Sequence, residues 1–363
     1  MLRALQGARA RTGVIPAPVD GRPAYACIGI VPCDARGVIP HAYVPRHDSL
    51  ASLPRAIQDG RERAPHLAAG GTRMQTGAFR GFEVAIEDPG IAVVTFNQPE
   101  RLNGLNQWIK RDLVETFLQI QMDDSIRLVV ITGQGRAFCA GDDITGRPDG
   151  GGEPLMADIP GGHRNAIGTY EGLRGLSQPL TMAVRNLDKL CIAAMNGIAI
   201  QSGFSLALAC DFRIASREAR MGSATMRFAL LPDEGGQYLL VQHMGVAKTM
   251  DFLMRKRIVG ADEALELGLV HEVVEPDQCL PRAMALAREL ADGPNVAQRL
   301  LKRSIYNAAE MTFAHALDEI AAKTSITDHH PDAKEGTAAW RDKRPPRFNA
   351  WMGKPDSTTA EEA

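Results

Sequence analysis

The stretch LLPDEGG, residues 230–236, places two carboxylates, Asp233 and Glu234, between an apolar run and a pair of glycines. A carboxylate held in an apolar pocket has a raised pKa, so it can take up and release a proton near neutral pH. Asp233 would then carry a proton to or from a bound substrate. The structural alternative makes Asp233 the N-cap of a helix that begins at Glu234, with the Glu234 carboxylate in solvent near the helix dipole. The residues alone leave both interpretations open.

Two other stretches could bind negative charge through the backbone. AFCAGDD (137–143) follows a buried strand, and NGIAIQSGFSLALACD (196–211) ends a strand in small residues that open a helix. Small residues let the backbone approach a ligand closely, and the N–H groups at a helix start are unpaired. Two such N–H groups converging on one point would stabilise a developing oxyanion. Each motif by itself fits a tight strand-to-helix turn equally well.

The elements that must position these residues alternate between strands and helices. Residues 82–88 and 91–97 predict a β-hairpin, and apolar residues spaced at helical intervals predict a helix over 104–121. Mainly apolar runs at 126–133 and 189–200 predict buried strands. The glycine- and proline-rich stretch 146–165 predicts a substrate loop or lid, and from about residue 234 the chain is mainly helical. This pattern is α/β in class.

Composition narrows the class of protein. The 363 residues carry a formal net charge of -2 and are 45% apolar, which fits a globular protein without a nucleic-acid partner. No apolar run reaches the roughly 18 residues that a membrane span needs. The six cysteines have no regular spacing, so we expect reduced thiols rather than a disulfide framework. Histidines and cysteines are not clustered at metal-ligand spacing, and we expect no metal site.

The first 73 residues differ from the rest, with ten arginines, five acids and no lysine. Prolines interrupt every candidate helix in this part of the chain. We therefore expect residues 1–78 to be an N-terminal extension, either disordered or lying upstream of a start at Met74. An Arg-rich organellar targeting segment is the alternative.

Six motifs in order resemble the enoyl-CoA hydratase/isomerase (crotonase) family: NQPERLNGLN, ITGQGRAFCAGDDI, CIAAMNGIAI with LALACDFRIAS, LLPDEGGQYLL, RIVGADEALELGLVHEVV and KEGTAAWRDKRPPRF. They span residues 80 to about 349. The resemblance implies a crotonase-like spiral of ββα turns over 79–272, a helical oligomerisation region at 273–349 that builds trimers or hexamers, and a tail at 350–363. It implies an acyl-CoA thioester as substrate, with coenzyme A as part of that substrate and no separate cofactor.

The resemblance also assigns residues. The thioester oxygen would lie between the backbone N–H groups of Asp142 and Ser202. Adenine would pack near Ala140 and Asp143, and Arg101 is a candidate for a contact with a coenzyme A phosphate, a solvated turn arginine being the alternative. The remaining candidates for substrate binding are the neighbours of these residues in the two motifs, Gly141, Ile144 and Gly203.

The chain departs from the family pattern at the acids. The hydratases of this family use two glutamates, and the matching positions here are Ser205 and Thr225. Neither side chain can replace a carboxylate in proton transfer, which contributes roughly 10²–10⁴-fold to rate. Asp233 instead falls where enoyl-CoA isomerases of the family carry a single catalytic carboxylate, and Glu234 is the second candidate.

These residues predict a cytoplasmic enzyme that shifts a double bond in an acyl-CoA, with an organellar location if residues 1–73 are a transit segment. Two alternatives remain open. One is hydration of an enoyl-CoA, with Asp233 or Glu234 activating water. The other is an acyl-CoA-binding protein without catalysis.

Overall fold

The structure is a computed structural model of the chain, and it describes residues 74–143 and 165–352. The candidate Ile144, nearly all of the predicted substrate loop and the two terminal segments lie outside the described residues. The described part begins at Met74, whose backbone N–H donates to Asp123 Oδ2 over 2.9 Å. The residues directly after Met74 form a short edge strand, although the sequence placed them in the extension.

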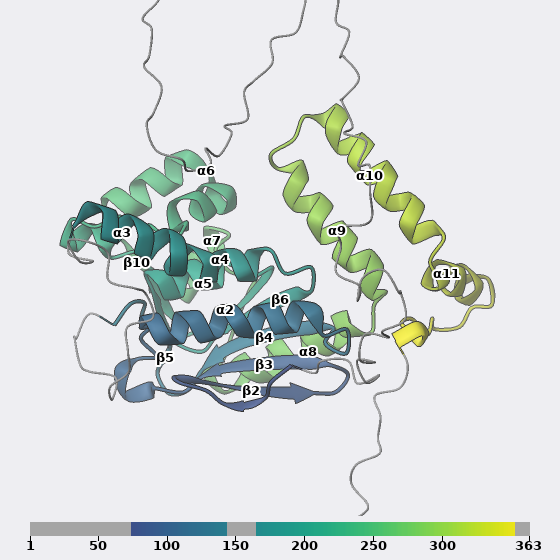
Figure 1. Cartoon of the computed structure of the whole chain (residues 1–363), viewed down its shortest axis with the longest axis horizontal. Coiled ribbons are helices and arrows are strands. Elements are labelled where there is room, and N and C mark those ends of the chain that lie inside the picture. The colour runs from purple at the N-terminus through teal and green to yellow at the C-terminus, as the bar shows by residue number, and fades with distance from the viewer. Residues whose placement is uncertain (1–73, 144–164, 353–363) are drawn as a thin grey trace, which may run out of the picture. The chain divides into compact units, whose positions relative to one another are not determined.

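A seven-stranded sheet forms the centre of the fold (Figure 1). Its strands are, in spatial order, β1 (Gly77–Ala78), β2 (Phe82–Glu87), β3 (Ile91–Phe96), β4 (Leu128–Gly133), β6 (Leu190–Met195), β8 (Phe212–Ser216) and β11 (Glu272–Val274). The strands from β3 onward are parallel, whereas β2 and β3 form the antiparallel hairpin that the sequence predicted.

A second, four-stranded sheet contains β10 (Ile258–Gly260), β9 (Arg220–Gly222), β7 (Ile198–Ile200) and β5 (Ala137–Cys139) in that order. Each pair of consecutive strands, β4 with β5, β6 with β7 and β8 with β9, contributes one strand to each sheet before the chain enters a helical segment. This repeated strand–strand–helix unit confirms the α/β class and the spiral of ββα turns.

Residues 189–200 correct one prediction, because they form two strands rather than one. Strand β6 ends at Met195 and β7 begins at Ile198 in the other sheet. Between them, a Cβ added to Gly197 would lie 2.2 Å from the Arg136 carbonyl oxygen, so only glycine fits there. The Asn196-Gly197 pair at this break is a turn signal that the prediction of a single strand overlooked.

The two faces of the large sheet are covered by different helices. Along β3, Ala92, Val94 and Phe96 face the core shared with α2 (Gln107–Met122), whereas Ile91 and Val93 face α8 (Cys279–Ala291). Figure 1 shows α2 lying along the sheet above β3 and β4. Burial on both faces explains why these strands are almost wholly apolar.

The other helices of the ββα turns are α3 (Ala166–Gly172), the π-helical turn η3 (Leu173–Ser177), α4 (Gln178–Arg185), α5 (Ser202–Ala209), α6 (Gly236–Met254) and α7 (Ala261–Glu266). The C-terminal helices are α9 (Asn295–Ala308), α10 (Phe313–Asp328) and α11 (Pro331–Arg341). Short 3₁₀ turns lie at η2 (Pro99–Arg101), η4 (Thr225–Phe228), η5 (Pro276–Gln278) and η6 (Ala350–Met352).

Four of the six cysteines lie in the described residues, and all four are buried free thiols: Cys139, Cys191, Cys210 and Cys279. This confirms the prediction of reduced cysteines for these four. Among the described helices, none combines the length and the apolar character needed to cross a membrane.

Candidate functional site

The two turns that carry Asp142 and Ser202 lie in direct backbone contact. A Cβ added to Gly203 would lie 2.2 Å from the Cys139 carbonyl oxygen, and one added to Gly141 would lie 2.8 Å from the Ile200 carbonyl oxygen. Gly141 also has a φ of +88°, in the left-handed region that favours glycine. Glycine at both positions therefore lets the ends of β5 and β7 meet.

Within residues 74–143 and 165–352, neither predicted N–H donor has a protein acceptor. Leu105 donates to the Gly141 carbonyl and accepts from the Asp143 N–H, so the Asp142 N–H points to the opposite side. Ser202 is the first residue of α5, and the first helical bond of that turn is donated by Ser205. The N–H groups before it have no partner within the helix. The two turns can thus offer backbone donors to one ligand atom.

The side chains at these two positions also meet. Ser202 Oγ donates to Asp142 Oδ1 over 2.6 Å, and Lys110 Nζ donates to Asp142 Oδ2 over 2.8 Å. Lys110 comes from α2 and is buried, with 4% of its surface exposed. The sequence analysis missed this lysine. One sequence feature could have indicated it: Lys110 follows Ile109, which belongs to the buried apolar stripe of an amphipathic helix.

The adjacent carboxylates at 233 and 234 differ in environment. Glu234 is only 7% exposed, whereas Asp233 is half-buried. Burial, together with the negative charges of Asp142 and Asp233, raises the pKa of Glu234 to about 8. Asp142 carries one of the predicted oxyanion donors, so Glu234 lies within electrostatic reach of that turn.

The expectation of a solvated Glu234 at the start of a helix is therefore wrong. Gly235 has a φ of +95° and α6 begins only at Gly236, so the two acids lie in the preceding turn. Asp233 is not the N-cap, and its carbonyl accepts a hydrogen bond from Gln178 Nε2 over 3.0 Å. The turn, rather than the helix, directs Glu234 inward.

Two hollows flank the site. One of about 490 Å³ is bordered by Lys110, Asp142 and Asp143, together with α3 and η3. The other, of about 260 Å³, is bordered by Asp233, Glu234, residues of α4 and the first turns of α6. Ser177 borders the first and Gln178 the second, so the junction of η3 and α4 lies between the hollows.

The apolar side chains just before the two acids are exposed. Phe228, Leu230 and Leu231 are all more than half exposed, so these side chains do not enclose Asp233 in the described chain. Met182 of α4 and Tyr238 of α6 border that hollow instead.

Arg101 and Asp143 form an ion pair at the edge of the oxyanion turn. Their side chains are 17% and 6% exposed, so Arg101 is not a freely solvated turn arginine. Ala140 is half-buried between them and β5. These residues thus gather at one edge of the larger hollow, which Asp143 borders.

The positions of the two absent glutamates are buried. Ser205 is 3% and Thr225 is 6% exposed, and the Thr225 hydroxyl lies 3.1 Å from that of Ser223. A Cβ added to Gly236 would lie 2.7 Å from Ser205 Oγ, so the turn bearing Glu234 packs directly on Ser205. The start of α6, two residues after Glu234, is thus held against the second turn of the site.

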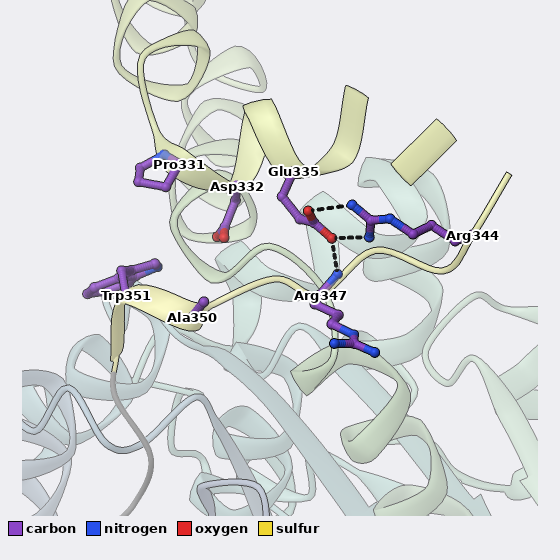
Figure 2. Close-up of a pocket in the computed structure, with 7 residues that line it drawn as sticks. All are labelled: Pro331, Asp332, Glu335, Arg344, Arg347, Ala350 and Trp351. Atoms are coloured by element: carbon purple, nitrogen blue, oxygen red, sulfur yellow. Dashed lines mark hydrogen bonds and ion pairs between the residues drawn. The ribbon is translucent and has the colours of Figure 1, made fainter. Parts of the chain in front are cut away.

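A separate hollow of about 480 Å³ lies in the C-terminal region (Figure 2). Within it, Arg344 binds both oxygens of Glu335, and the Arg347 backbone N–H donates to the same carboxylate. None of the predicted site residues borders it. These bonds hold the segment after α11 against that helix.

Comparison with known proteins agrees with this geometry. The family model described as enoyl-CoA hydratase/isomerase matches residues 87–351. The 1,2-epoxyphenylacetyl-CoA isomerase of Escherichia coli is 33% identical, over 72% of this chain and 95% of its own length. A probable enoyl-CoA hydratase of Rhodobacter capsulatus is 32% identical, over 71% of this chain and 94% of its own.

Solved structures give the same result. The enoyl-CoA hydratase of Bacillus anthracis superimposes with a TM-score of 0.67 at 29% identity, covering 74% of this chain and 98% of that chain. A putative enoyl-CoA hydratase of Streptomyces coelicolor superimposes with a TM-score of 0.68 at 31% identity, covering 79% and 99%. The fold is therefore the crotonase fold, and the chain belongs to the enoyl-CoA hydratase/isomerase family.

Proposed function

We propose that this protein is an enoyl-CoA isomerase, which shifts a double bond along the acyl chain of a coenzyme A thioester. The observation that carries the proposal is the pair of adjacent acids, Asp233 and buried Glu234, beside the contacting turns of Asp142 and Ser202. The two backbone N–H groups would hold the thioester oxygen, and the acids would move the proton.

The chemistry balances without any further reactant. Asp233 takes the proton from C2 of a 3-enoyl-CoA, and the electron pair moves onto the thioester oxygen as an enolate stabilised by the two N–H groups. Glu234, whose pKa is raised to about 8 chiefly by burial, holds a proton at neutral pH and donates it to C4. The hydrogen bond between the two side chains then returns the proton from Asp233 to Glu234.

The absence of both hydratase glutamates supports isomerisation over hydration. Ser205 and Thr225 stand where the hydratases of the family carry their two glutamates, and the Escherichia coli relative is named as an isomerase. A double-bond shift needs one proton removed and one returned, which the pair at 233 and 234 supplies without water.

Hydration is the second candidate function. A protonated Glu234 beside the Asp233 carboxylate is also an acid and base pair of the kind that water addition requires. Several relatives are named as probable hydratases, including that of Rhodobacter capsulatus. A third candidate, an acyl-CoA-binding protein without turnover, predicts tight binding of the thioester and no product.

We further propose how the substrate is held. Arg101 and Asp143 would contact coenzyme A at the edge of the larger hollow, with Ala140 and Gly141 against the adenine side and Gly203 at the thioester. Ile144 remains a candidate for substrate binding from the sequence motif alone. Coenzyme A would enter only as part of the substrate, with no separate cofactor and no metal.

The assembly and location complete the proposal. The C-terminal helices would mediate self-association into a trimer or hexamer, and the protein would act in the cytoplasm, without a membrane or nucleic-acid partner. An organellar location is the alternative if the N-terminal segment is a transit sequence.

The test compares Asp233→Asn and Glu234→Gln with the full-length protein on a medium-chain 3-enoyl-CoA. We expect Asp233→Asn to lower kcat/KM roughly 10²–10⁴-fold, as loss of a proton-transfer group does. Asp277→Asn, on an exposed aspartate in η5, is the matched control and should retain the full rate. An Asp233→Asn protein that isomerises at the normal rate would show that this mechanism is wrong.

A further inference from the structure

The side chain of Asp142 creates a problem for the proposed oxyanion site. Its N–H is one of the two proposed donors, so its carboxylate lies within one residue of the charge that develops on the thioester oxygen. A negative carboxylate there opposes that charge and weakens the site. A cation that neutralises Asp142 would remove the conflict.

Lys110 supplies that cation. Its Nζ donates to Asp142 Oδ2 over 2.8 Å and to Ser177 Oγ over 2.9 Å. The lysine side chain is 5% exposed whereas that of Asp142 is 44% exposed, so the ammonium reaches Asp142 from the protein interior. Asp142 and Lys110 act on the pKa of Glu234 in opposite directions, so the charge pair faces the acids as well.

The second oxygen of Asp142 ties the two turns together. Asp142 Oδ1 accepts from Ser202 Oγ over 2.6 Å, and Ser202 bears the other proposed donor. Each oxygen of the carboxylate therefore accepts a hydrogen bond, one from a residue of α2 and one from a residue of α5. This arrangement fixes the turn after β5 relative to the start of α5 by side-chain bonds in addition to backbone contact.

We infer that Lys110 is a positioning residue of the oxyanion site: its ammonium neutralises Asp142 and, through Asp142 and Ser202, holds the two donor turns in register. The inference rests on the proposed function, because it assumes that a thioester oxygen binds between these turns. It assigns a role to a residue on α2 that itself does not reach the reacting atoms.

The inference predicts an unusual pattern among variants. Lys110→Met leaves Asp142 as an unneutralised charge beside the thioester, so it should impair the site. Lys110→Met combined with Asp142→Asn removes that charge, and the amide can still accept from Ser202. The double variant should therefore work better than the single lysine variant. A purely structural ion pair predicts the same rescue of folding, so a readout of carbonyl polarisation is needed to separate the two roles.

The experiment uses the full-length protein and two readouts. The first is the rate of 3-enoyl-CoA isomerisation, for which Lys110→Met should lower kcat by about tenfold or more with a smaller change in KM. The second is the absorption maximum of a conjugated aryl-enoyl-CoA on binding. Donation by the two N–H groups polarises the carbonyl and moves that maximum to longer wavelength. Lys110→Met should reduce this red shift, and the double variant should recover part of both signals.

Lys248→Met is the matched control, because Lys248 is exposed on α6; it should leave both readouts unchanged. A full red shift and a normal rate in Lys110→Met would overturn the inference, as would a double variant no better than the single one. If the wild type shows the red shift but no isomerisation, the proposed function fails while the variants still test Lys110. If the wild type shows no red shift, the oxyanion site itself is refuted and the inference with it.

Discussion

At the scale of single residues, the two adjacent acids differ because the chain turns between them and the helix. Glu234 is buried within electrostatic reach of Asp142, whereas Asp233 is only half-buried. The residue types predicted that one acid enters a site. They favoured Asp233 and placed Glu234 in solvent, whereas Glu234 is the buried acid, because its direction depends on the turn at the left-handed Gly235 and on the packing of Gly236 against Ser205.

The raised pKa of Glu234 predicts an alkaline limit to activity. Glu234 holds its proton up to about pH 8, so kcat should fall as the pH rises through that value and the donor is lost. Glu234→Gln should have a lower kcat, and its kcat should not fall further as the pH rises through this range. A pH–rate profile of both proteins tests this, and an unchanged alkaline limb in Glu234→Gln would assign that limb to another group.

The same shift links stability to pH. The folded protein retains the Glu234 proton up to about pH 8, whereas an unfolded glutamate releases it near its ordinary value of 4.5. The folded state therefore binds more protons between these values, and the free energy of unfolding should fall as the pH rises through this window. Urea unfolding at several pH values should show a shallower fall for Glu234→Gln; equal slopes would contradict the assignment.

At the scale of elements, the site depends on how closely β5 and β7 approach each other. Gly203→Ala would place a methyl group 2.2 Å from the Cys139 carbonyl, a contact that no rotation relieves. We expect the two turns to separate and kcat to fall more than KM rises. Gly260→Ala, where an added Cβ meets no atom within 4 Å, is the control. Normal kinetics in Gly203→Ala would show that the contact of the turns does not govern catalysis.

Helix α9 is attached to the ββα core by a buried ion pair. Lys302 Nζ lies 2.8 Å from Asp211 Oδ2, with side chains 3% and 9% exposed. Lys302→Met leaves the aspartate without its cation, and we expect a loss of about 3–5 kcal/mol in the free energy of unfolding. Urea unfolding measures it, with Lys334→Met on exposed Lys334 as control. A change within about 0.5 kcal/mol, as for surface sites, would contradict this role.

Sequence patterns predicted elements best where periodicity is strong. The hairpin β2–β3, helix α2 and strand β4 follow from alternating or helical spacing and from length. Strands β5, β9 and β10 have three residues each, too few for a period to emerge, and they pair only with distant segments. Lys110 was missed for a related reason, because its partner Asp142 lies 32 residues away in sequence.

At the scale of the whole molecule, exposed apolar side chains on the C-terminal helices predict self-association. Leu301 and Ile305 form a stripe on α9, and Phe313 and Leu317 form one on α10, all more than half exposed in the single chain. We expect a native mass of three or six chains by analytical ultracentrifugation. Leu301→Glu with Ile305→Glu should dissociate the assembly, and a monomeric wild type would contradict the proposal.

The order of the ββα turns was predictable because six motifs occur in sequence along the chain. The closing of those turns into two sheets was not, since it rests on pairings such as β5 with β7 that join segments about 60 residues apart. The site arises from that closure, because Asp142, Ser202 and Glu234 come from three successive turns of the spiral.

The most direct test of the central claim is to follow double-bond migration and water addition separately, with the full-length enzyme in ¹⁸O-labelled water. A medium-chain 3-enoyl-CoA and the matching 2-enoyl-CoA are supplied in parallel, and the products are read by absorbance and mass. If Asp233 and Glu234 transfer protons through an enolate, the 3-enoyl-CoA is converted to the 2-enoyl-CoA and the product contains no ¹⁸O. Gain of one labelled water by the 2-enoyl substrate, without isomerisation of the 3-enoyl substrate, would contradict the isomerase and assign the same two acids to hydration.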